Sequence, residues 1–119
     1  MLKTYASTHP DFDWHQLNQL AGEDVDFAIE LLDIFLKDAQ NSLTLIERAI
    51  AAQSTQALED SAHALKGASV NVGANAIAQI AQQLEQSARK GSVAQAKERF
   101  QELRDRIQTL RNKTIANVQ

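Results

Sequence analysis

The chain has 119 residues, of which 44% are hydrophobic and 23% charged, with no cysteine and a formal net charge of −3. This length fits one domain with a single core, and the composition excludes a disulfide framework, a thiolate nucleophile and a cysteine-ligated zinc site. The negative charge argues against nucleic acid as a partner, and no apolar run reaches the roughly 20 residues of a membrane span or forms a secretion signal, so we expect a cytoplasmic protein.

The residue types predict an all-α chain. One proline and four glycines leave few places to break it, while alanine, leucine, glutamine and charged residues, which favour helix, dominate. We expect a short first helix over residues 11–20, ended by Gly22. One long helix should follow over 24–53, where apolar residues recur three and four positions apart.

Three more helices follow in the prediction. Ser54 or Thr55 can cap a helix that runs to about Val72, with the break at Gly73. Another helix covers 74–90 before a glycine at the position that helix C-termini prefer. The last helix opens at Ser92, and its apolar residues alternate three and four apart up to position 110.

Short turns make helices that are adjacent in sequence antiparallel. We therefore predict a single domain over 1–119, an up-down antiparallel four-helix bundle with a short additional N-terminal helix, whose ends at 1–10 and 113–119 fray. Residues 1–60 hold 11 acids and 3 bases (net −8), and residues 61–119 hold 4 acids and 9 bases (net +5). The halves could attract each other or leave one face of each sign, and we expect a monomer.

The helix over 55–72 places a histidine on its polar side. At about 100° of rotation per residue, His63 lies roughly 135° from the centre of the apolar sector. Lys66 and Gly67 follow three and four residues later, so both adjoin His63 on the surface. Val70 is an apolar residue one turn further on the same side. A neutral imidazole nitrogen is a good nucleophile near pH 7 and can form a covalent intermediate.

A phosphoryl group as cargo gives each neighbour a task. The phosphorylated ring carries close to two negative charges, which Lys66 can offset. Gly67 costs roughly 1 kcal/mol of helix stability relative to alanine and leaves room for a partner's loops beside the ring. Val70 can supply an apolar docking contact. The pattern alone fits equally well a surface histidine without function, a solvated lysine and a glycine that allows a close helix crossing.

Residues 62–85 resemble the histidine-containing phosphotransfer (HPt) domain family and read A-H-A-L-K-G-A-S-V-N-V-G-A-N-A-I-A-Q-I-A-Q-Q-L-E. The likeness covers roughly 11–110, through D-F-D-W-H-Q-L-N-Q-L-A-G-E-D, E-L-L-D-I-F-L-K-D-A and A-R-K-G. In this family a histidine takes a phosphoryl group from a receiver-domain aspartate and passes it to another. The resemblance implies that His63 is the phosphoryl acceptor and donor, Lys66 the charge partner and Gly67 the clearance residue.

The resemblance also directs attention to the helix over 74–90. Family members place a polar side chain from this helix near the histidine, and Glu85 occupies that position. An ionised glutamate cannot donate a hydrogen bond to phosphate, so Gln82 and Gln83 are the candidates for that contact. We expect Val70, Glu59, Gln82 and Glu85 to contribute to partner docking. An ordinary solvated helix face is the alternative for Glu85 and both glutamines.

We therefore expect a phosphocarrier of a two-component phosphorelay, a phosphoprotein in signal transduction rather than an enzyme. The chain has no glycine-rich phosphate loop, so it should not bind ATP by that route. We also expect no cofactor bound by this chain. Its partners would be receiver domains of a hybrid histidine kinase and of response regulators, which would bind the Mg²⁺. A single Asp60–His63 pair on the outer side does not predict a metal site.

Two other functions stay open from the sequence. One is the phosphorylated histidine module of a chemotaxis-type kinase, labelled directly by an ATP-binding domain. The other is a non-catalytic helical adaptor that binds partners without phosphate. The starting Met1 and the lack of a following domain favour a free-standing protein. The last helix interleaves its basic residues with acids, so we expect a solvated face there and no nucleic-acid or membrane partner.

Overall fold

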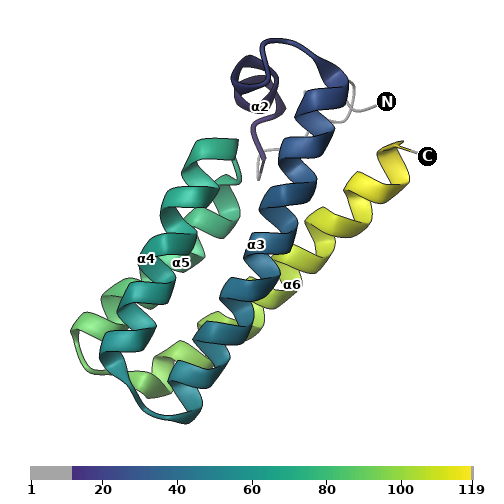
Figure 1. Ribbon diagram of the computed structural model, residues 1–119. Helices are drawn as coiled ribbons and strands as arrows, with labels where there is room; N and C mark the ends of the chain where they lie inside the picture. The colour runs from purple at the N-terminus through teal and green to yellow at the C-terminus, as the bar shows by residue number, and fades with distance from the viewer. Residues whose placement is uncertain (1–11, 119) are drawn as a thin grey trace.

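A computed structural model describes the backbone of residues 12–118 and the side chains of residues 12–112. All the regular secondary structure in this part of the chain is α-helix: α2 (Trp14–Leu20), α3 (Val25–Ala51), α4 (Thr55–Val72), α5 (Asn75–Arg89) and α6 (Val93–Val118). Helices α3 to α6 form the bundle, and α2 lies over the end at which α3 begins (Figure 1). The predicted all-α bundle with a short extra N-terminal helix is confirmed.

Side-chain caps set the start of three helices. Each cap residue is extended, and its side-chain oxygen accepts a hydrogen bond from a backbone N–H in the first turn; the cap residues are Asp13, Asp24 and Ser54. The helix predicted over 55–72 matches α4. The first helix begins at Trp14 rather than at residue 11, because Asp13 is its cap; residue 11 itself lies outside the described residues.

Gly73 ends α4 and joins it to α2. Its φ of 83° is left-handed, a conformation that glycine adopts without strain. The backbone N–H of Asp13 donates to the Gly73 carbonyl at 2.8 Å, and a Cβ on Gly73 would lie 2.7 Å from the Asp13 carbonyl oxygen. Both the turn and the close approach of α2 therefore require a glycine here.

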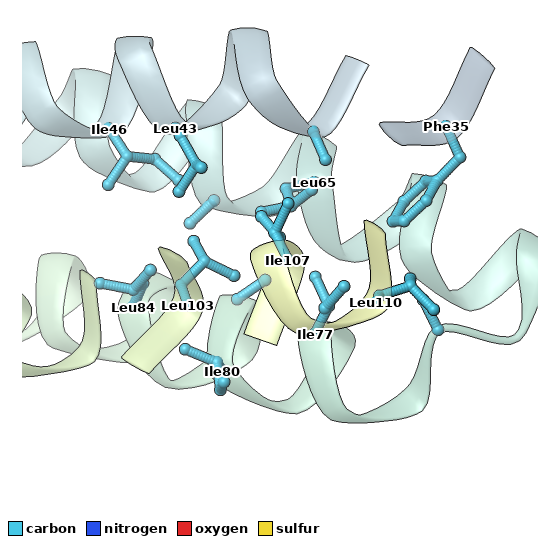
Figure 2. Packing of buried hydrophobic residues seen from close by; sticks show 14 of the residues in the cluster. Phe35, Leu43, Ile46, Leu65, Ile77, Ile80, Leu84, Leu103, Ile107 and Leu110 are labelled. Atoms are coloured by element: carbon cyan, nitrogen blue, oxygen red, sulfur yellow. The ribbon is translucent and has the colours of Figure 1, made fainter. Parts of the chain in front are cut away.

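All four bundle helices contribute to one hydrophobic core. Figure 2 shows apolar side chains of the four helices meeting between them, including Phe35, Leu43, Ile46, Leu65, Ile77, Ile80, Leu84, Leu103, Ile107 and Leu110. Helices α4 and α5 lie side by side along their length (Figure 1). Side chains on successive turns of α4 can therefore contact side chains on successive turns of α5.

The backbone of α6 stays helical to Val118. The fraying expected from Lys113 onward stays a prediction. Residues 1–10 and Gln119, for which fraying was also expected, lie outside the described residues. Among the helices described, none combines the length and hydropathy needed to cross a membrane.

Candidate functional site

His63 lies at the middle of α4 on its solvent-facing side. Its side chain is 67% exposed. The residues that α4 buries are those of the predicted apolar sector: Leu58, Ala62, Leu65, Ser69 and Val72. The local helix geometry therefore presents the ring to solvent, as the rotation per residue predicted.

A carboxylate from the neighbouring helix holds this ring. Glu85 of α5 is 2% exposed, and its Oε2 lies 2.6 Å from His63 Nδ1. Its other oxygen, Oε1, accepts a hydrogen bond from Lys66 Nζ at 2.6 Å. One buried carboxylate thus binds the imidazole and the ammonium that the sequence placed side by side, and it links α4 to α5.

The surroundings of Glu85 determine its charge. The hydrogen bond from Lys66 is the largest influence and holds the pKa of Glu85 below its ordinary value, against burial, which raises it. The hydrogen bond from His63 and the positive charges of Lys66 and Arg89 lower this pKa further. Glu85 is therefore an ionised acceptor near neutral pH.

An ionised carboxylate has no proton to donate. The contact at 2.6 Å then requires that His63 Nδ1 carry the hydrogen and donate it to Glu85 Oε2. In a neutral ring this leaves the lone pair on Nε2, the nitrogen on the opposite side of the imidazole. The arrangement selects one tautomer and one nucleophilic atom.

The backbone at Gly67 is open to its surroundings. Apart from its chain neighbours and the backbone of its own helix, a Cβ built at this position meets no heavy atom within 4 Å. No neighbouring helix therefore requires a glycine here, and the alternative of a close helix crossing does not explain it. The open position lies one turn from the His63 ring on the same exposed side of α4.

Arg89 was not among the residues predicted from the sequence. Its Nη2 donates to Glu85 Oε2 at 3.2 Å, and its Nε donates to Glu59 Oε2 at 2.8 Å. Spacing carried a signal for it, because Glu59 stands four residues before His63 on α4 and Arg89 four residues after Glu85 on α5. Because α4 and α5 are antiparallel, the contact between His63 and Glu85 also brings Glu59 next to Arg89.

The residues predicted to dock a partner fall into different environments. Val70 is 53% exposed at the end of α4, where the side chain of Gln16 donates to its carbonyl oxygen at 2.6 Å. Gln82 is exposed on α5. The side chain of Glu59 is 30% exposed, and its carboxylate is paired with Arg89.

Glu85 requires a correction. Glu85 was predicted to contribute to partner docking, with a place on a solvated helix face as the alternative. Both predictions need an exposed side chain, and only 2% of Glu85 is exposed. Its oxygens are occupied by His63, Lys66 and Arg89, which leaves no carboxylate surface for a partner. Neither Gln82 nor the exposed Gln83 forms a hydrogen bond to His63 in the part of the chain whose side chains are described.

Comparisons with known proteins agree with this geometry. The profile of the Hpt domain family matches residues 30–113. Histidine-containing phosphotransfer protein B (HptB) from Pseudomonas aeruginosa PAO1 is 30% identical, with a TM-score of 0.84 over 92% of this chain and 96% of that chain. The HPT domain of an Hpt sensor hybrid histidine kinase from Shewanella shares the fold at 18% identity, with a TM-score of 0.73 over 91% and 93% of the two chains. No curated protein matches the chain.

Proposed function

Because this chain belongs to the Hpt domain family, whose members transfer phosphoryl groups in two-component phosphorelays, we propose that His63 is the residue that carries the group. Hpt domains are phosphocarriers rather than kinases, and they interact with receiver domains of histidine kinases and response regulators. The observation that supports His63 most directly is its exposed ring with Nδ1 held 2.6 Å from the Glu85 carboxylate.

The chemistry follows from that hydrogen bond. The lone pair of Nε2 attacks the phosphorus of an aspartyl phosphate on a receiver domain. The Nε2–P bond forms while the P–O bond to the aspartate breaks, and the aspartate leaves as a carboxylate. The hydrogen on Nδ1 stays in place, so the ring becomes positively charged and Glu85 neutralises it at 2.6 Å. The reverse step delivers the group to a second receiver aspartate.

Lys66 and Gly67 support the same step. The Lys66 ammonium, one turn from the ring and 30% exposed, offsets the charge of the phosphoryl group. Gly67 keeps the approach to Nε2 open for the receiver's loops, since nothing lies within 4 Å of where its side chain would start. Val70 and Gln82, both exposed, form part of the docking surface, and Glu59 borders it.

The receiver domain supplies the remaining groups in this proposal. It contributes the aspartate and the Mg²⁺, and this chain acts without an ATP site, metal or cofactor of its own. Among residues 12–112, no three side chains of the metal-binding types gather into a site. A monomer and a location in the cytoplasm stay predictions.

A single labelling experiment separates this proposal from its two alternatives. The protein is mixed with labelled ATP and a hybrid kinase that lacks its own HPt domain. Label that reaches this chain only when the kinase retains its receiver domain supports the phosphorelay. Label from the kinase core alone would indicate a chemotaxis-type module, and binding without label would indicate an adaptor. His63→Gln is the control and should accept no label.

A further inference from the structure

Glu85 has more positive partners than a single carboxylate needs. Lys66 Nζ binds Oε1 at 2.6 Å, while Arg89 Nη2 lies 3.2 Å from Oε2, the oxygen that also accepts from His63 Nδ1. Lys66 alone already gives this buried carboxylate an oppositely charged partner. Two cations converge on this one, from different helices.

The transfer step itself gives the second cation a role. If His63 carries the phosphoryl group, as proposed above, Lys66 is the nearby ammonium that can bind it. Once Lys66 Nζ turns to the phosphoryl group, Oε1 of Glu85 loses its partner. Until the Nε2–P bond forms the His63 ring is neutral, so a buried Glu85 carboxylate that has lost Lys66 and has no second cation would be costly and would take up a proton. A protonated Glu85 could no longer neutralise the imidazole ring.

We propose that Arg89 is a positioning residue, which keeps Glu85 ionised and bonded to His63 Nδ1 while Lys66 leaves Glu85 for the phosphoryl group. This inference rests on the proposed function. The step transfers no atom between protein groups: the ammonium exchanges one anionic acceptor for another, and the guanidinium stays on Oε2.

Glu59 fixes Arg89 for this task. The Arg89 side chain is 59% exposed, so an unanchored guanidinium would be free to turn into solvent. Its Nε instead donates to Glu59 Oε2 at 2.8 Å, which leaves Nη2 for Glu85. Glu59 and His63 lie one turn apart on α4, opposite Arg89 and Glu85 on α5, so each carboxylate of the group faces a hydrogen-bond donor on the other helix.

The first test measures the His63 tautomer by nitrogen-15 NMR of the imidazole. The variants are Arg89→Gln, Lys66→Gln and the double variant. Arg99→Gln is the matched control, because it removes a surface ion pair to Glu102 at 3.3 Å on α6. Each single variant leaves Glu85 one cation, so we expect the Nδ1–H tautomer in both and its loss only in the double variant. A double variant that keeps this tautomer, with folding verified by circular dichroism, overturns the proposal.

The second test measures the rate of phosphorylation by phosphoramidate, a small donor that labels histidine without a receiver. Because Arg89 alone holds Glu85 while Lys66 binds the phosphoryl group, Arg89→Gln should slow labelling by about tenfold although its resting tautomer is unchanged. Arg89→Lys should restore most of the rate lost in Arg89→Gln. A labelling rate for Arg89→Gln equal to that of the wild-type protein would overturn the proposal. If receivers fail to label the wild-type chain, the proposed function fails, while the tautomer measurement still decides the role of Arg89.

Discussion

Oε2 of Glu85 lies 2.6 Å from Nδ1 of His63, although the two residues are on different helices and only His63 faces solvent. The buried carboxylate holds the exposed ring from its inner side. In the proposed mechanism, this contact leaves Nε2 as the nucleophilic atom and places a negative charge where the phosphorylated ring would become positive.

The first prediction concerns that negative charge. Glu85→Gln keeps the size of the side chain and an oxygen that can accept from Nδ1, but it cannot neutralise a positive ring. Transfer from a phosphorylated receiver should therefore slow by roughly 10- to 1,000-fold. Stopped-flow or gel-based transfer assays measure the rate, with Glu102→Gln on α6 as the control. A rate equal to that of the wild-type protein would exclude an electrostatic role for Glu85.

Glu85 should also make stability depend on pH. Its pKa is lowered in the folded protein from an ordinary value of 4.5, chiefly by the Lys66 hydrogen bond, so ionised Glu85 stabilises the fold above that value. The contribution is lost as the pH falls through the lower pKa of the folded state. We expect the difference in unfolding free energy between the wild type and Glu85→Gln to shrink as pH is lowered from about 5 to 2.5. Urea unfolding measures it, and a difference that grows toward acid would contradict the assignment.

Two substitutions at Gly67 separate its effect on protein stability from its effect on the approach of a receiver domain. Since a Cβ there meets nothing within 4 Å, Gly67→Ala should stabilise the protein by about 1 kcal/mol. Gly67→Gln should slow transfer from a receiver while leaving labelling by phosphoramidate unchanged, because only the receiver needs the space. Ala57→Gln, on an exposed position of the same helix, is the control. Equal slowing with both donors would count against the clearance role.

Replacing Gly73 by alanine should lower the free energy of unfolding, in contrast to the same change at Gly67. A Cβ would lie 2.7 Å from the Asp13 carbonyl oxygen, at a φ of 83°, so Gly73→Ala should cost about 2–4 kcal/mol. Gly91→Ala is the matched control, because Gly91 has a φ of 73° but open space around it, and it should cost only about 1 kcal/mol. Thermal unfolding measures both variants. Equal losses would mean that the contact with α2 contributes nothing.

The sequence predicted the local features of this site well. The limits of α4 and the outward position of His63 depend on cap residues and on the rotation per residue, which are properties of a short stretch of chain. The bundle itself followed from apolar spacing and short turns. The identity of the carrier residue stays a prediction until phosphate transfer is measured.

Local periodicity alone could not predict the partners of His63, although the family resemblance placed Glu85 near the ring, and its Oε2 does lie 2.6 Å from Nδ1. These partners depend on the register between α4 and α5, which local periodicity does not specify. Glutamate side chains are usually exposed and are fully buried only when they are paired. The burial of Glu85 therefore depends on partners that its own helix does not reveal. One signal was available: Glu85 lies four residues after Ala81 and three before Ala88, both buried, which places it at the edge of the buried stripe of α5.

The central claim is that Nε2 of His63 carries the phosphoryl group, and the most direct measurement is NMR of the chain, labelled with nitrogen-15 histidine, after transfer from a phosphorylated receiver. We expect one phosphohistidine, at position 63, with phosphorus bonded to Nε2 and hydrogen on Nδ1. Phosphorus on Nδ1, or label that persists in His63→Gln, would contradict the account.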